Sequence, residues 1–393
     1  MELCATLVLL AALAQDPFAR VHDALFLRTG IDGKSYGAAE LDPLLFPASR
    51  WPLAVPSEQA LLEALAALHE AGASGQTPRA RTLLQRDLRA AFDWVFDHDP
   101  HSPLAAALAR GMRDVAPASD ELRALRTDPA GVEGLPAGVL DASQGWVPLA
   151  DALGRTITPG HETRFGERSR FEVLLRLPGG REPTLAWLER LRALPDPLTG
   201  AADERHFRAD LPLLPPQTEV ALVRRALAIS AQGELLASDL VESVQLRRFL
   251  VEDPSGSSER PSCDLSKAQQ VAEFRIDRSG AHALRVLGPE QYDFNDFGKH
   301  GEDPFEGDAQ SWSWLKPGSV SCGACHAQPG IYSVNSFTRM TSGPGTILSI
   351  SPHGRPSVFV EADRARLAEA ALRSARDTDS FRALMAGWNP APR

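Results

Sequence analysis

The chain has 393 residues, a formal net charge of −10, 43% hydrophobic residues and 23% charged residues. That balance is typical of a soluble globular protein and excludes a disordered or collagen-like chain. The acidic charge argues against a nucleic-acid partner, because a nucleic-acid-binding surface needs a basic stripe. The length suffices for about two or three domains of ordinary size.

The first apolar segment runs from Leu3 to Ala14 and ends in the small-x-small sequence ALA before Gln15. Such a run predicts a signal peptide over residues 1–14, which would place the mature protein in the periplasm or otherwise outside the cytoplasm. No Lys or Arg precedes Arg20, so the alternative is a retained, buried N-terminal helix in a cytoplasmic protein. The run is too short to cross a bilayer, which takes about 20 apolar residues. No stable membrane span is expected.

Residues 15–135 are predicted to form a helical region, whose helices follow a Gly- and Pro-rich loop that extends to Pro56. Each predicted helix begins at a Ser or Thr whose side chain can accept a hydrogen bond from the first turn. In two of them a proline stands at the first helical position, where it is tolerated. Gly72 is expected to end the first of these helices. The predicted capping residues are Ser57, Thr77 and Ser102, and a shorter helix is expected to follow Ser119.

Strand patterns dominate residues 136–255, the predicted α+β region. The segments RFEVLLR, from Arg170, and TEVALVRRALAISAQGELLASDL, from Thr218, are rich in Val, Leu and Ile, and a Gln-Gly turn divides the second. TLAWLERLRAL, from Thr184, predicts a short helix. A further strand pair, VAEFRID and HALRVLG, is expected across Arg278-Ser279-Gly280. The fold class predicted for the whole chain is therefore α+β.

Residues 256–393 form the last predicted region, which is rich in loops and ends in one or two helices after Glu361. An exposed linker, EDPSGSSERPS, leads into it. Within this region lies SVSCGACH, in which two residues separate Cys322 from Cys325 and His326 follows directly. The chain holds only 4 cysteines and 10 histidines, so this pattern is not expected by chance.

The Cys-x-x-Cys-His spacing has a chemical reason. Two thiols at this separation can form thioethers with the two vinyl groups of one haem, and the adjacent histidine is then delivered under the iron. Gly323 and Ala324, which stand between the thiols, are small enough to let the attachment loop lie against the porphyrin edge. The residues therefore predict a covalent haem site.

Cys322, Cys325 and His326 resemble the haem-attachment motif of the c-type cytochromes. The resemblance implies covalently bound haem c, with His326 as the proximal iron ligand, assembly outside the cytoplasm and redox activity. It covers five positions of the chain, so it implies a cofactor and not a fold. The segment DAQSWSWLKPGSV, which precedes the motif, lacks the helical pattern that usually leads into it in that family.

A zinc site or a redox dithiol is the alternative for the same cysteines. A structural zinc needs four ligands, and Cys263, His300 or His353 could complete such a set with Cys322 and Cys325. A thioredoxin-like dithiol would begin a helix, which the Pro-Gly pair shortly after the motif disfavours. With zinc at this site, the chain would instead be a cytoplasmic interaction protein whose fold the metal stabilises.

The sixth iron ligand decides between electron transfer and catalysis. Met340 is the first candidate, because a thioether ligand raises the reduction potential. His353 and His300 are the next candidates, and either would give bis-histidine ligation and a lower potential. An open or water-bound site would instead suit a haem enzyme that acts on peroxide or on small nitrogen compounds.

The sequence as a whole predicts an exported monohaem c-type cytochrome-like protein that transfers electrons. Seven acids lie between Glu290 and Asp308, with Lys299 as the only base among them. An acidic rim attracts basic partners and speeds their encounter. This run is therefore either a solvated acidic loop or the docking site of a basic redox partner protein.

Overall fold

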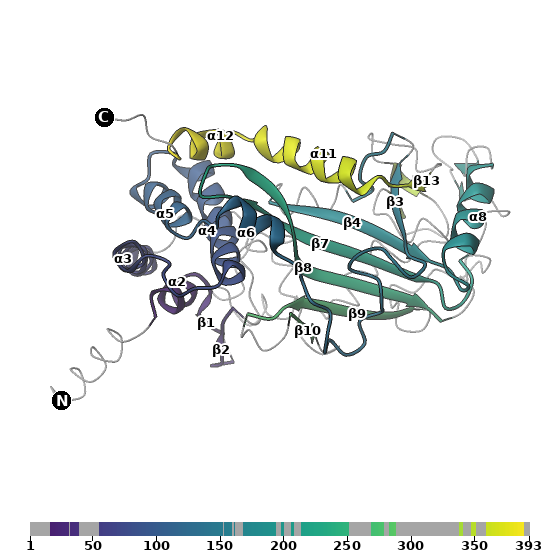
Figure 1. The fold of residues 1–393 in the computed structure, drawn as a ribbon, viewed down its shortest axis with the longest axis horizontal. Helices are drawn as coiled ribbons and strands as arrows, with labels where there is room; N and C mark the ends of the chain where they lie inside the picture. Colours follow the sequence, from purple (N-terminus) through teal and green to yellow (C-terminus); the bar gives the residue numbers. More distant parts are fainter. Residues whose placement is uncertain are drawn as a thin grey trace.

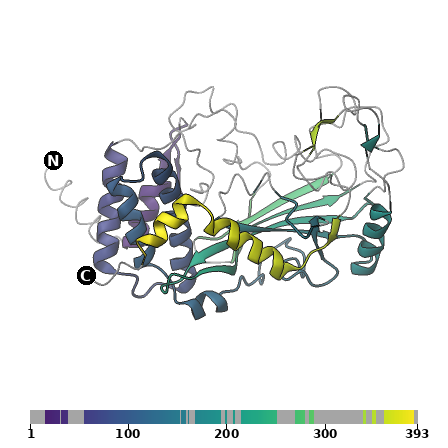
Figure 2. The same ribbon diagram turned by 90° about the horizontal axis from the view of Figure 1, so that it is seen from above.

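The computed structural model has a group of helices at one end of an antiparallel sheet, which confirms the predicted α+β class (Figure 1). One further helix lies at the far end of the sheet. Of the two helices near the C-terminus, the first runs along the sheet and the last lies against the helical group (Figure 2). The structure describes residues 16–30, 32–38, 55–151, 153–158, 161, 168–193, 198–199, 206–207, 214–250, 269–278, 283–287, 338–340, 347–350 and 359–388.

The helices predicted from capping residues are present. The Thr77 side chain accepts a hydrogen bond from the Ala80 N–H at 3.2 Å, and Ser102 accepts one from Leu104. Gly72 follows the first of these helices with a φ of +67°, a left-handed conformation that glycine adopts without strain. The helical group consists of α2 (Pro17–Phe26), α3 (Val55–Ala71), α4 (Pro78–His98), α5 (Pro103–Asp114) and α6 (Ser119–Ala124).

Two expectations for the start of the helical region are wrong. Helix α3 begins at Val55, so Ser57 lies in its first turn and is not its cap. Helix α2 occupies part of the segment expected to be a loop. Its start uses a cap and a proline, because the Asp16 side chain accepts from the Phe18 N–H and Pro17 is the first helical residue. Its apolar face is buried against α3, which stabilises the short helix.

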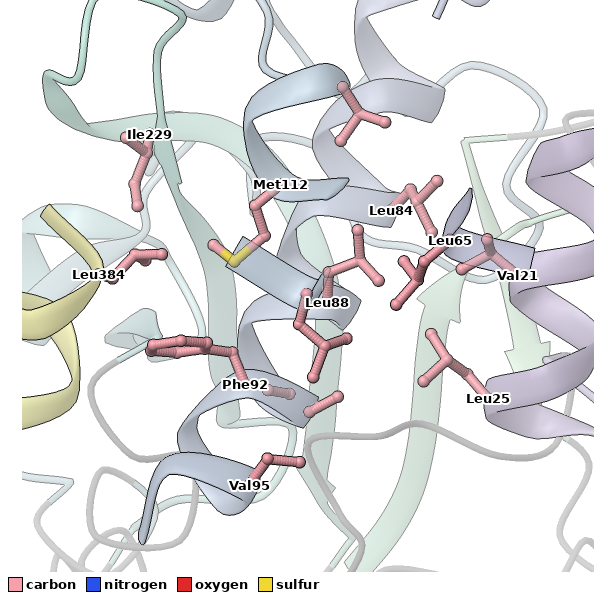
Figure 3. Packing of buried hydrophobic residues seen from close by; sticks show 14 of the residues in the cluster. Val21, Leu25, Leu65, Leu84, Leu88, Phe92, Val95, Met112, Ile229 and Leu384 are labelled. Carbon is pink, nitrogen blue, oxygen red and sulfur yellow. The ribbon is translucent and has the colours of Figure 1, made fainter. Parts of the chain in front are cut away.

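Helix α4 lies at the centre of the helical group and contacts α5, α6, α12 and strand β7. Its side chains Leu84 and Leu88 are fully buried, and Met112 of α5 is fully buried beside them. Figure 3 shows how this apolar cluster reaches from Val21 on α2 to Leu384 near the C-terminus. The core thus joins the first and the last described helices.

The sheet is antiparallel throughout and has the strand order β10-β9-β8-β7-β4-β3-β13. The predicted hairpin with the Gln-Gly turn is β7–β8, and the predicted pair across Arg278 is β9–β10. Strands from residues 136–255 and from residues 256–393 therefore share one sheet. The bounds are β3 (Val147–Asp151), β4 (Ser169–Arg176), β7 (Glu219–Ile229), β8 (Leu235–Phe249), β9 (Gln269–Ile276), β10 (Leu284–Leu287) and β13 (Phe359–Glu361).

The register defines a transverse row with one residue from each strand. Residues opposite one another in antiparallel strands point to the same face of the sheet. The row consists of Leu287, Glu273, Gln245, Leu222, Val173, Leu149 and Glu361. It fixes which side chains share a face, and it places β10 and β13 at opposite edges.

Two helices, α8 and α11, pack against strands of the sheet. The predicted short helix α8 (Arg181–Arg192) contacts β3, β4 and β13, and Trp187 packs there among buried apolar side chains. The predicted closing helices are α11 (Arg364–Arg376) and α12 (Asp379–Ala386). Helix α11 contacts β4 and β8, and α12 contacts α4. The C-terminal helices therefore connect the sheet with the helical group.

Short strand pairs complete the described structure: β1 (Arg28–Thr29) with β2 (Ser35–Tyr36), β5 (Leu198–Thr199) with β6 (His206–Phe207), and β11 (Thr338–Met340) with β12 (Ile347–Ile350). None of the described helices has the length and apolar character needed to cross a membrane. The predicted signal peptide, residues 1–14, and the predicted linker after Glu252 lie outside the described residues.

The position of Leu88 gives a test of the helical core. We expect Leu88→Ala to lower the free energy of unfolding by about 2–5 kcal/mol, because the side chain is fully buried and its loss leaves a cavity. Leu153→Ala is the matched control, since Leu153 is 61% exposed. Urea unfolding followed by circular dichroism measures both variants. Equal effects of the two substitutions would contradict the packing of α4.

Candidate functional site

The structure describes one of the predicted haem-site residues. Met340 is the last residue of β11, where its backbone is paired with Ile347 of β12. The donor set of the motif fits haem chemically, because two thiols can form the thioethers and an imidazole suits iron. The other predicted ligands and attachment residues lie outside the described part of the chain: Cys322, Cys325, His326, His300 and His353.

The described strands show where the segment that carries the motif leaves and rejoins the sheet. The chain leaves at Leu287, the end of β10, and rejoins it at Phe359, the start of β13. These strands form the two edges of the sheet (Figure 1). Six strand spacings of ~4.8 Å separate them, which is about 29 Å. Residues 288–358 must therefore connect opposite edges of the sheet.

Buried charges hold the helical group against the sheet close to the end of β9, before the chain enters β10. The side chains of Arg86 and Asp87 on α4 and of Glu242 on β8 are at most 1% exposed. Arg86 forms ion pairs with Asp87 at 3.0 Å and with Glu242 at 3.1 Å. Glu242 also accepts a hydrogen bond from the Ser169 hydroxyl at 2.5 Å. Arg278, which follows β9, donates to both carboxylate oxygens of Asp87, at 2.6 and 2.9 Å.

A second buried network lies where the chain re-enters the fold after β13. Glu172 on β4 is 1% exposed and accepts hydrogen bonds from Arg170 at 3.0 Å and from Arg364 at 2.9 Å. Arg225 on β7 lies 3.4 Å from the same carboxylate. Arg364 is the first residue of α11, so Glu172 fixes the start of that helix on the sheet.

The pKa of Glu172 reflects this surrounding. Burial alone raises the pKa of the carboxyl, but the positive charges of Arg225, Arg170 and Arg364 outweigh burial and lower it. The ionised form is therefore the stable one in the fold. Because the folded pKa lies below the ordinary value, this stabilisation is present above the ordinary pKa and is lost as the pH falls through the lowered one.

His22 on α2 lies at the edge of the first network. Its Nδ1 is 4.0 Å from the Asp87 carboxylate, and its ring stacks on Phe26. Burial, reinforced by the positive charge of Arg278, lowers the pKa of His22 to about 4, although Asp87 opposes the shift. The imidazole is therefore neutral at pH 7 and contributes apolar packing.

Sequence reasoning did not find these networks. The segment LLQRDLRAAFDW in α4 contains Arg86, Asp87 and Asp93, and such residues usually mark the solvent face of a helix. All three are buried here. One feature of the sequence could have indicated the buried charges: charged residues recur so often along α4 that they leave no continuous apolar stripe on one side of the helix.

The two described networks consist of ion pairs between arginines and carboxylates of the same chain, which is a structural role. Arginine forks bind carboxylates with two parallel hydrogen bonds, as Arg278 does with Asp87. Within the part of the chain that the structure describes, no group of three or more His, Cys, Asp and Glu side chains could hold a metal ion. The chemistry predicted for this protein therefore depends on the motif at Cys322–His326.

Comparison of the chain with protein-family models, with curated proteins and with solved structures gives no match. The functional argument therefore relies on the motif and on the scaffold that bounds it.

The network around Glu172 yields a stability test. We expect Glu172→Gln to lower the free energy of unfolding at pH 7 by about 3 kcal/mol, because three arginines lose their shared buried carboxylate. Glu189→Gln is the matched control, since this glutamate is exposed and pairs only with Arg192 within α8 among the described residues. Urea unfolding at pH 7 compares the two. A control effect as large as that of Glu172→Gln would contradict the stabilising role of the network around Glu172.

The lowered pKa of His22 predicts a pH dependence of stability. Between about pH 4 and pH 6.5 the unfolded chain binds a proton at His22 that the folded chain does not, so acidification in this range destabilises the fold. We expect His22→Gln to reduce the loss of stability between pH 6.5 and pH 4.5 by about 1–2 kcal/mol. The exposed His101 provides the control variant, His101→Gln. Unchanged pH profiles of unfolding in His22→Gln would contradict the assigned pKa.

Proposed function

We propose that this chain is an exported monohaem c-type cytochrome-like protein. Cys322 and Cys325 bind the haem through thioethers, and His326 ligates the iron. The single observation that carries the proposal is the complete Cys-x-x-Cys-His motif, which occurs once in the chain. The predicted signal peptide, residues 1–14, agrees with it, because covalent haem attachment takes place outside the cytoplasm.

Electron transfer is the activity that such a site supports best. The haem supplies a metal centre that can accept and release one electron. The chain supplies the proximal ligand, and a sixth ligand that closes the iron to substrates would favour electron transfer alone. Met340 is the first candidate, and His353 and His300 follow. The electron partner is a redox protein, whose basic surface would dock near the acidic run at residues 290–308.

The described scaffold bears on the proposal in two ways, one in favour of electron transfer and one against it. Strands β10 and β13 hold both ends of residues 288–358 on one sheet, so the haem segment is bounded by rigid structure. The scaffold also exceeds what a small electron carrier needs to bury a core. Its size favours a second candidate function, a haem enzyme with an open sixth position that acts on peroxide or on small nitrogen compounds.

A haem-stained denaturing gel tests the proposal. Protein made with its export signal and the haem-attachment machinery is expected to keep a haem band after denaturation, because thioethers survive it. The double variant Cys322→Ala with Cys325→Ala should lose the band, and the control Cys263→Ala should keep it. A chain without haem under these conditions would refute the proposal. Zinc bound through Cys322, Cys325 and a histidine would then be the reading to test.

The absorption spectrum of the haem-loaded protein separates the two functions. A six-coordinate, low-spin spectrum is expected for electron transfer, and loss of the methionine ligand in Met340→Ala would identify the sixth ligand. A five-coordinate, high-spin spectrum of the unaltered protein would instead support the enzyme.

A further inference from the structure

His22 lies in the middle of α2, at the margin of the helical group. Helix α2 has 10 residues, and helices this short are marginal in water unless tertiary packing stabilises them. Its apolar face packs on α3 and is buried through Phe18, Val21, Leu25 and Phe26. Figure 1 shows α2 beside α3, whereas α4 lies between this pair and the sheet. The helix therefore depends on contacts at one border of the fold.

The surroundings of His22 suit a neutral imidazole and not a protonated one, whose two N–H groups both need acceptors. Its buried Nδ1 has no hydrogen-bond partner and lies 4.0 Å from the Asp87 carboxylate, too far for a hydrogen bond. Both oxygens of that carboxylate already accept from Arg278, and Arg86 pairs with it at 3.0 Å. Protonation would therefore place a third cation beside a carboxylate that two arginines occupy.

The charges around the imidazole balance one another, so burial decides which form is stable. The groups that act on it are Asp87 and Arg86 on α4, Arg278 after β9, and Asp23 on α2 itself. The imidazole stacks on Phe26, and the Arg278 guanidinium lies 4.7 Å from the centre of the same phenyl ring. Burial, reinforced by the positive charge of Arg278, holds the pKa of the imidazole at about 4. A protonated imidazole regains water when α2 moves away from α4.

We propose that α2 is an acid-sensitive element of this fold, which protonation of His22 releases from α3 and α4 before the rest of the structure opens. After release, Asp87 keeps Arg86 and Arg278 as partners, so the junction of α4 with the sheet persists. The released helix presents its apolar face to the solvent. The device involves the helical group and does not depend on haem.

The position of α2 explains why it opens first. Local opening costs less free energy at a marginal element than at a central one, and α4 contacts α5, α6, α12 and β7. Protonation favours only those open states in which His22 has left its surroundings. With an ordinary pKa of 6.5 and a folded pKa of about 4, the equilibrium constant for release rises about fifty-fold between pH 7 and pH 4.5.

Hydrogen exchange of the unaltered protein, followed by mass spectrometry, tests the proposal. The rates at pH 7 and pH 4.5 are corrected for the intrinsic pH dependence of amide exchange. We expect the protection of α2 to fall about fifty-fold at pH 4.5, while α4 stays many-fold more protected than α2. Equal protection of the two helices at pH 4.5 would mean that the fold opens as a whole. Unchanged protection of α2 would mean that the imidazole titrates without release of the helix. Either result would overturn the proposal.

A substitution at His22 assigns the effect to the imidazole. The amide of His22→Gln takes up no proton in this range, so we expect the protection of α2 to change less than about two-fold between the two pH values. The control His101→Gln alters an exposed histidine and should keep the full pH dependence. Weaker packing in His22→Gln would lower the protection of α2 equally at both pH values. A fall on acidification as large as that of the unaltered protein would refute the role of His22.

Discussion

Two buried carboxylates, Asp87 and Glu242, determine how the helices and the sheet fit together. Removal of a carboxylate from water is costly unless charged donors replace the lost hydration. Arg86 faces both carboxylates, and Arg278 holds Asp87 with two hydrogen bonds. Asp87 can keep these partners only while α4 lies across the end of the sheet. The apolar core around Leu88 then packs in one arrangement, because the charges exclude any shift of the helix.

The same kind of interaction lies beside each of the two strands, β10 and β13, that bound the segment predicted to bind haem. Arg278 stands in the turn before β10, and Arg364 stands just after β13, where it binds Glu172. Arg278 pairs with a buried carboxylate on α4, and Arg364 pairs with a buried carboxylate on β4. Strands β10 and β13 therefore hold the two ends of this segment. The side chains that fix these strands in the fold lie outside the haem motif.

The sequence predicted the helices and strands better than it predicted the contacts between them. Thr77-Pro78 and Ser102-Pro103 identified helix starts because capping is a local interaction, and the same reasoning would have found α2 from Asp16-Pro17. Strands β8 and β9 pair although a long connection separates them in the sequence. The local hydrophobic pattern cannot predict such a pairing. The sequence could not predict that charged residues of α4 are buried, because their partners lie on β8 and after β9. The motif at Cys322 predicts chemistry, and its geometry lies outside the described residues.

The opposite-edge placement of β10 and β13 also bears on whether the segment between them could be removed. Domains inserted into a host fold usually have neighbouring termini, so that the host closes around a single loop. Here the two junctions are separated by the full width of the sheet, about 29 Å. Excision of residues 288–358 would leave a gap that no tight turn could close, and a linker of at least about nine extended residues would be needed. The segment that carries the Cys-x-x-Cys-His motif therefore joins opposite edges of the sheet, and its removal would require a replacement linker of that length.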